Sequence, residues 1–134
     1  MESRIHFATK AVIFKDNKVL IVKKNDNEDV NPNTFDIPGG RLEFGEKPVD
    51  SLKREVREEV GLEVDVIRPS RVWSLVKDDK FQLVGVTFLC RYTSGNVALG
   101  DEHNSYIWVD MNDYEKNNLS PWIGEEISAA KEIA

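Results

Sequence analysis

Three carboxylates fall close together in the sequence, at Glu55, Glu58 and Glu59. On an α-helix, Glu59 would lie about 40° from Glu55 and Glu58 about 60° from it on the other side, so all three would share one flank. Like charges four residues apart cost a helix roughly 0.2–0.5 kcal/mol per pair, unless a cation lies between them. Mg²⁺ prefers oxygen ligands and shares itself between carboxylates and substrate phosphates. Beside the glycines at 39–40, the cluster is therefore a candidate Mg²⁺–phosphate site.

The same charges also have a simpler interpretation. Lys53, Arg54 and Arg57 are interspersed with the three glutamates. Such charge runs are commonly solvated helix faces, held together by ion pairs. The residue types by themselves leave both interpretations open: a metal site or a salt-bridged surface.

The helix that would carry these glutamates is predicted to begin at Pro48 and to end before Gly61. Its apolar residues recur at steps of three or four, as in an amphipathic helix. They are Val49, Leu52, Val56 and Val60. Lys47 precedes the proline and cannot accept a hydrogen bond from the free backbone N–H groups, so the helix start is expected to be poorly capped.

Strands are predicted on both sides of this helix. The apolar runs 11–14 and 19–22 flank a polar gap and predict a hairpin. Further strands are predicted at 34–37, 64–67, 71–76, 81–92 and 106–109, with a loop at 24–33 and a second helix at 123–133. In that helix Ile127, Ala130 and Ile133 are expected to be buried. This pattern indicates an α+β fold with a mixed sheet, in a single domain over residues 1–134.

The stretch Gly40–Leu62, GRLEFGEKPVDSLKREVREEVGL, resembles the Nudix box, G-x5-E-x7-R-E-U-x-E-E-x-G-U, where U is a bulky aliphatic residue. The fixed positions are all filled, by Gly40, Glu46, Arg54, Glu55, Val56, Glu58, Glu59, Gly61 and Leu62. The preceding FDIPGG is similar to the family's W-x-x-P-G-G, with Phe35 in place of tryptophan. The chain is thus identified as a MutT-like member of the Nudix hydrolase family, which implies an α/β/α sandwich.

The resemblance implies a loop–helix–loop that binds Mg²⁺ or Mn²⁺ and cleaves a nucleoside diphosphate linked to another group. By position, Glu55, Glu58 and Glu59 correspond to the metal-binding glutamates, and the Gly40 region would add a backbone carbonyl. Bound metal would neutralise phosphate oxygens, lower the pKa of a bound water and align it for attack.

Three further residues take roles from the resemblance. Arg54 and Glu46 correspond to the ion pair that steadies the loop around the metal. The segment Asp101–Val109 resembles the family's E-x(n)-W-V segment, where a loop glutamate can reach the metal or act as a base; Glu102 is either that residue or an exposed loop acid. The general base is either Glu58 or a downstream carboxylate, and spacing does not choose between them.

The box specifies the bond that is cleaved but not the leaving group. The proline typical of ADP-ribose hydrolases is absent from residues 77–79, and Lys80 and Phe81 stand where diadenosine polyphosphate hydrolases favour a tyrosine. A short chain that has the Nudix box but lacks the motifs of other subfamilies is typical of MutT-like enzymes, which release NMP and pyrophosphate from nucleoside triphosphates. The alternatives are another nucleoside diphosphate-linked compound, such as a dinucleotide or nucleotide sugar, and a non-catalytic nucleotide-binding module.

Four residues are candidates for contact with the substrate. Lys23 and Lys24 end the second predicted strand, where they would either meet phosphates or remain solvated. Trp73 and Phe81 flank a predicted turn, where they would either stack on a base or pack into the core.

For three more residues the sequence predicts no special role. Cys90 lies in an apolar strand and is expected to be a small buried residue. His6 and His103 have no partners at metal-ligand spacing and are expected to be ordinary surface or edge residues.

Composition narrows the class of protein. The chain has 134 residues, enough for one compact domain, and a formal net charge of −6, which disfavours binding to nucleic acid polymers or anionic membranes. Its one cysteine excludes an intrachain disulfide, and it has no apolar run of membrane-spanning length and no signal-peptide pattern. These features predict a cytoplasmic protein, and the family resemblance implies a small nucleotide as its partner. The family resemblance also allows a homodimer.

Overall fold

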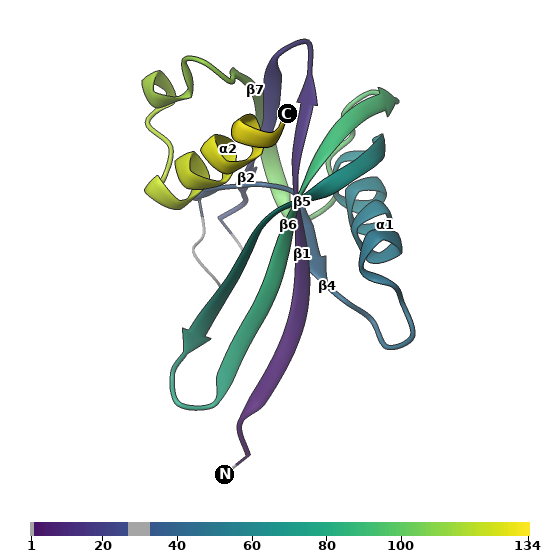
Figure 1. Ribbon diagram of the computed structural model, residues 1–134, viewed down its shortest axis with the longest axis vertical. Coiled ribbons are helices and arrows are strands. Elements are labelled where there is room, and N and C mark those ends of the chain that lie inside the picture. Colours follow the sequence, from purple (N-terminus) through teal and green to yellow (C-terminus); the bar gives the residue numbers. More distant parts are fainter. Residues whose placement is uncertain (1, 27–32) are drawn as a thin grey trace.

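The computed structural model describes residues 2–26 and 33–134. Within them, seven strands form one mixed sheet in the order β3-β2-β1-β6-β5, with β4 paired to β1 and β7 paired to β2. The elements are β1 (Arg4–Lys15), β2 (Lys18–Lys24), β3 (Phe35–Asp36), β4 (Gly39–Arg41), α1 (Pro48–Val60), β5 (Glu63–Lys77), β6 (Phe81–Ser94), β7 (His103–Asp110), η1 (Tyr114–Asn117) and α2 (Pro121–Ile133). The helices α1 and α2 lie on opposite sides of the strands (Figure 1). The predicted α+β sandwich with a mixed sheet is therefore confirmed.

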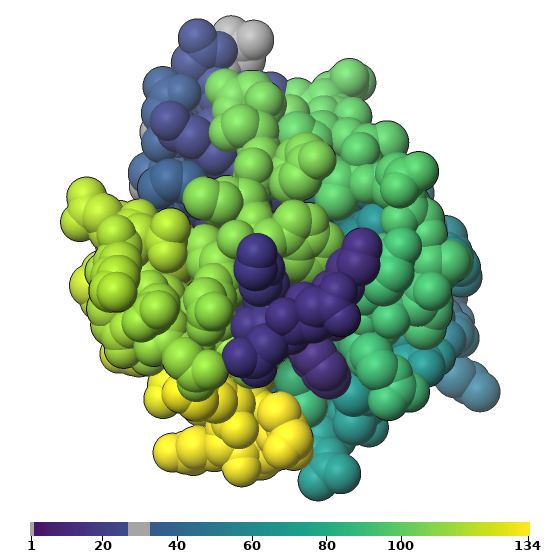
Figure 2. Space-filling model, turned by 90° about the horizontal axis from the view of Figure 1, so that it is seen from above, coloured from purple at the N-terminus to yellow at the C-terminus, as the bar shows by residue number. Residues whose placement is uncertain are grey.

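The predicted hairpin joins β1 to β2 through a two-residue turn. Lys15 pairs with Lys18, and Asp16 and Asn17 between them both have positive φ, which is the conformation of a type I′ turn. Asn and Asp tolerate this conformation better than most residues, so the sequence and the backbone agree here. Seen from above in Figure 2, the purple turn lies at the surface, and its residues are exposed.

Strand β1 changes its neighbour along its length. Close to the turn it pairs with β2, whereas Ala8, Thr9 and Lys10 pair with β4. On its other side, β1 pairs with β6 in parallel from Arg4 to Phe14. Beyond β4, the strands β1, β6 and β5 continue together as a long arm (Figure 1).

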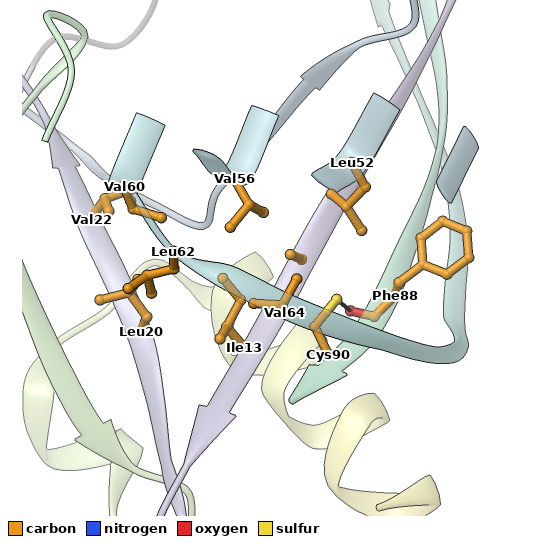
Figure 3. Close-up of a cluster of buried hydrophobic side chains, with 11 residues drawn as sticks. Ile13, Leu20, Val22, Leu52, Val56, Val60, Leu62, Val64, Phe88 and Cys90 are labelled. Carbon is orange, nitrogen blue, oxygen red and sulfur yellow. Dashed lines mark hydrogen bonds between the residues drawn. The ribbon is translucent and has the colours of Figure 1, made fainter. Parts of the chain in front are cut away.

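Two hydrophobic cores lie on the two faces of the sheet. Ile13 and Leu20 pack under α1, in the cluster that Figure 3 shows, while Val12 and Val19 pack under α2. Because successive residues of a strand point to opposite faces, a strand that is covered on both faces has to be apolar at every position. This explains why the runs 11–14 and 19–22 show no polar alternation.

Helix α1 has the predicted bounds, and three of its four regularly spaced apolar residues are buried. Leu52, Val56 and Val60 are fully buried, whereas Val49 is 39% exposed. Val49 lies only about 20° around the helix from Val56, within the same apolar stripe, and its exposure follows from its place in the first turn of the helix. Lys47 forms no side-chain cap, as expected.

Two expectations about these elements need correction. The strands predicted at 64–67 and 71–76 are one strand, β5, whose pairing with β6 shifts register on either side of Pro69. Proline cannot donate to the ladder, so a bulge accommodates it within one strand. Ile133 is half-buried rather than buried, because it lies in the last turn of α2. The loop predicted at 24–33 lies partly outside the described residues.

Replacing Leu52 by alanine is expected to destabilise the fold by about 2–5 kcal/mol, because it leaves a cavity under α1. Val49→Ala on the same helix is the matched control and should change the free energy of unfolding by less than about 0.5 kcal/mol. Urea unfolding of both variants measures the difference. Equal losses would contradict the burial of only one of these side chains.

Candidate functional site

Two glycines place the backbone of β4 directly against α1. A Cβ on Gly40 would lie 2.6 Å from the carboxyl carbon of Glu55. Gly39 has a φ of +146°, and a Cβ there would collide with the backbone of Thr9 and Lys10. No side chain larger than hydrogen fits at either position without displacing a neighbour. The glycine pair therefore lets the Glu55 carboxylate touch the main chain.

Glu59 is the buried member of the glutamate cluster. Its side chain comes from the last turn of α1, it is 6% exposed, and the backbone N–H of Gly39 donates to its Oε2 at 3.3 Å. Burial raises the pKa of Glu59 from 4.5 to about 9; the Lys10 ammonium opposes this rise, while Glu55 and Glu102 add to it. The protein itself compensates the negative charge of a Glu59 carboxylate poorly, so the site favours an added cation.

The exposed Glu102 and the buried His103, where β7 begins, complete the buried cluster around Glu59. Glu59, Glu102 and His103 each offer a ligand atom, and these atoms lie within 4.8 Å of one another. His103 is buried, its Nδ1 is 3.9 Å from Glu59 Oε1, and that nitrogen has no hydrogen-bond partner among the described residues. Burial lowers the pKa of His103, which favours a neutral imidazole with a free lone pair. The expectation that His103 is an ordinary surface or edge residue was wrong, because pairing of β7 with β2 draws it inward.

Arg54 ties the loop before α1 to the helix. Its guanidinium donates to both oxygens of Glu46, at 2.7 and 3.0 Å, and also to Glu55 at 3.0 Å and Glu58 at 3.2 Å. The hydrogen bond from Arg54 lowers the pKa of Glu46 to about 2. Glu58 is 60% exposed on the outer side of this network. The run of charges is thus both an ion-paired surface and one wall of the buried cluster.

Lys10 and Asp36 form an ion pair that the sequence analysis missed. Lys10 Nζ lies 3.1 Å from Asp36 Oδ1 and 3.1 Å from the carbonyl of Ile37, and Lys24 Nζ lies 3.8 Å from Asp36 Oδ2. Burial lowers the pKa of Lys10, but Asp36 and Glu59 more than offset this, and the net pKa is raised. The available signal was a lysine within an otherwise uncharged strand segment.

A cavity of about 510 Å³ opens beside this ion pair. Of the predicted substrate-binding residues, Lys24, Trp73 and Phe81 line it, together with Lys10 and Asp36. The guanidinium carbon of Arg41 lies 4.7 Å from the centre of the Phe81 ring.

Lys23 lies elsewhere. It lines a separate cavity of about 120 Å³, with its ammonium 5.9 Å from the centre of the Phe35 ring. Adjacent residues of a strand point to opposite faces, so Lys23 and Lys24 are not expected to serve the same cavity.

A protein-family model described as "NUDIX domain" matches residues 4–129. The chain is a member of the Nudix hydrolase family. An ADP-ribose pyrophosphatase of Methanocaldococcus jannaschii is 30% identical over 110 residues, covering 81% of this chain and 64% of that protein. The nucleoside triphosphatase NudI of Salmonella arizonae is 25% identical over 120 residues, covering 81% of this chain and 84% of the relative. This chain thus spans less than two thirds of the first relative and most of the second.

The fold is that of solved Nudix structures. The MutT protein from Methanosarcina mazei superimposes with a TM-score of 0.84, covering 98% of this chain and 96% of that one, at 21% sequence identity. Within the described residues, no helix is long and apolar enough to cross a membrane.

The buried cluster fits the divalent metal that Nudix enzymes generally use. Its donors are carboxylate oxygens and one neutral imidazole nitrogen, and Gly40 leaves room for a carboxylate against the main chain. Oxygen ligands suit Mg²⁺, and Mn²⁺ also accepts imidazole.

Replacing Glu59 by glutamine is expected to stabilise the metal-free protein, and increasingly so as pH rises. The folded state holds the Glu59 proton more tightly than the unfolded chain, so the wild type loses stability as pH rises from about 4.5 towards about 9. Glutamine has no proton to lose. Thermal unfolding in EDTA should therefore separate the two proteins by a few degrees near pH 8 and by less near pH 5; a gap that shrinks as pH rises would contradict the burial of this charge.

Replacing Gly40 by alanine is expected to push the Glu55 carboxylate away from the main chain. We expect Mn²⁺ affinity to fall about 10–100-fold, as when groups that support metal ligands are lost. Electron paramagnetic resonance of free Mn²⁺ measures this affinity. Gly124→Ala in α2 is the control, and equal Mn²⁺ affinity in both variants would contradict the close approach at Gly40.

Proposed function

We propose that this Nudix enzyme hydrolyses a nucleoside triphosphate to NMP and pyrophosphate, with Mg²⁺ or Mn²⁺ bound at the buried cluster. The observation that carries the proposal is the contiguity of two sites. Lys10 lines the large cavity and also interacts electrostatically with Glu59 and Glu102. A nucleotide held in the cavity would therefore extend its phosphates towards the carboxylates. Because the chain carries a net charge of −6, it needs cations to hold such a substrate.

The residues of the predicted metal site each receive a role in this proposal. Glu55 and Glu59 would hold the cation, with Glu58 and the main-chain carbonyl near Gly40 as further ligands. Arg54 and Glu46 would keep the loop in place, since their bidentate ion pair joins it to α1. The metal would supply charge neutralisation and acidify a bound water.

Glu102 is our choice for the general base. Both Glu102 and Glu58 are exposed, but Glu102 offers a ligand oxygen within 4.8 Å of those of Glu59 and His103, whereas the Glu58 carboxylate accepts a hydrogen bond from Arg54. A base has to lie within hydrogen-bond reach of the proton that it removes. A carboxylate inside the cluster meets this requirement better than one outside it.

The substrate class has a second candidate. A relative named ADP-ribose pyrophosphatase supports a nucleoside diphosphate linked to another group, while the relatives named nucleoside triphosphatase NudI support a triphosphate. We favour the triphosphate because NudI aligns over more of its own length, 84% against 64%, and because the proline typical of ADP-ribose hydrolases is absent.

A substrate panel tests the proposal. With Mg²⁺ or Mn²⁺, we expect NMP and pyrophosphate from one or more common or oxidised nucleoside triphosphates, as measured by ion-exchange chromatography. Glu59→Gln should reduce turnover at least about 100-fold, because the metal site loses a charged ligand. Glu132→Gln, at an exposed position of α2, should match the wild type.

Two outcomes would contradict the proposal. Cleavage of ADP-ribose, dinucleotides or nucleotide sugars without cleavage of triphosphates would keep the metal site and replace the substrate. Binding of nucleotides without product release under either metal would favour the non-catalytic module.

A further inference from the structure

On the side formed by β5 and β6, the large cavity has an aromatic floor. The indole of Trp73 covers Gly85, where a Cβ would lie 2.2 Å from the ring. The indole N–H donates to the hydroxyl of Thr87 at 3.0 Å, and Thr87 is fully buried. The glycine and the hydrogen bond together fix the plane of the ring. A flat aromatic side chain held in this way is suited to stack on a planar ligand.

The wall beside this floor contains a buried carboxylate with one unused oxygen. Glu126 in α2 is 2% exposed and lines the cavity. Its Oε1 accepts a hydrogen bond from Arg71 at 2.8 Å, but its Oε2 is buried and has no hydrogen-bond partner among the described residues. A buried acceptor without a donor costs about 1–3 kcal/mol, so such a group calls for an explanation.

The ion pair with Arg71 joins α2 to β5 through Oε1 alone, so it does not account for the second oxygen of Glu126. Glu126 lies on the buried face of α2 with Ile123, Ile127 and Ala130, which all pack in one apolar core. An apolar residue there would fill the core at no electrostatic cost. The neighbouring Glu125 also pairs with Arg71, at 3.1 Å, so the arginine does not need Glu126 for neutralisation.

We propose that Glu126 and Arg71 form a base-recognition subsite, in which Glu126 Oε2 accepts a hydrogen bond from an N–H group of a nucleobase stacked on Trp73. This inference rests on the proposed function, since it assumes that the cavity receives a nucleotide. A phosphate is disfavoured at this wall because the carboxylates repel it. The remaining donors of Arg71 would face a carbonyl or ring nitrogen next to that N–H.

The donor on the base has two chemical sources. Guanine, adenine and cytosine carry an exocyclic amine beside an acceptor, and guanine and uracil carry a ring N–H beside a carbonyl. Both give the same pattern of one donor and one acceptor along a planar edge. Pairs of nucleotides that differ in a single amine separate the two sources.

The test measures binding of nucleoside monophosphates in EDTA by isothermal titration calorimetry, so that it requires no hydrolysis. For the monophosphate that the wild type binds best, Glu126→Gln should weaken binding at least about tenfold, as expected for a hydrogen bond to a charged group. Glu132→Gln is the control and should bind as the wild type does. Ribose 5-phosphate should bind equally to all three proteins, because it lacks the base.

A second set of titrations varies the nucleotide and uses both the wild type and Glu126→Gln. GMP is compared with IMP, CMP with pyrimidin-2-one riboside monophosphate, and AMP with purine riboside monophosphate. If removal of the amine from the nucleotide weakens binding to the wild type but not to Glu126→Gln, the amine is the donor. If removal of the amine has no effect on binding but Glu126→Gln still weakens it, a ring N–H is the donor. If Glu126→Gln does not fold, as shown by its thermal melting, Arg71→Lys takes its place, since lysine cannot donate in the same fork.

The proposal is overturned if Glu126→Gln keeps the affinities and the base order of the wild type, or if it weakens ribose 5-phosphate equally. It is also overturned if the folded wild type binds no monophosphate more tightly than ribose 5-phosphate. Failure of the hydrolase proposal would give a different result. The protein would then bind bases selectively through Glu126 but would release no pyrophosphate from any triphosphate.

Discussion

The desolvation of Glu59 is the constraint on which the arrangement of the site depends. A carboxylate that is 6% exposed loses most of its hydration and can keep its charge only where the protein or a bound ion replaces the lost water. The protein supplies Lys10 and one backbone N–H, and it then adds Glu55 and Glu102, which act in the opposite direction. A fold that places three acids together in this way is arranged for a cation, at some cost to its own metal-free stability.

The sheet makes this arrangement possible because β1 exchanges one neighbour for another. Near the hairpin turn β1 pairs with β2, and at Lys10 it pairs with β4 instead. Lys10 points to the same face as Val12, under α2, whereas Glu59 comes from α1 on the other face. Where β4 replaces β2, these two charges interact across the sheet. The change of partner therefore brings groups from the two helical layers into one site.

Local patterns in the sequence were sufficient for the parts of the fold that depend on neighbours along the chain. The spacing of apolar residues in α1, the Asp16–Asn17 turn and the Nudix box could all be identified without coordinates. Groups whose environment depends on distant segments could not. His103 is buried because β7 pairs with β2, and Lys10 forms an ion pair with Asp36, which is twenty-six residues away in the sequence. Pairing between strands that are distant in the sequence produces no periodic pattern of residues. The only local sign of it here is a charged residue, Lys10, inside an apolar run.

Glu126 illustrates how such a trace can be used. Its helix has an apolar face, and an acid on that face is a local inconsistency that packing does not require. Sequences that fold well agree with their structures at most positions, so departures tend to mark groups kept for function. Glu59 is the same kind of departure in α1, and it lies in the metal cluster. Each helix thus buries one acid at the edge of its core, one by the candidate metal cluster and one by the Trp73 floor, and the large cavity extends from the Lys10 side of the first to the second.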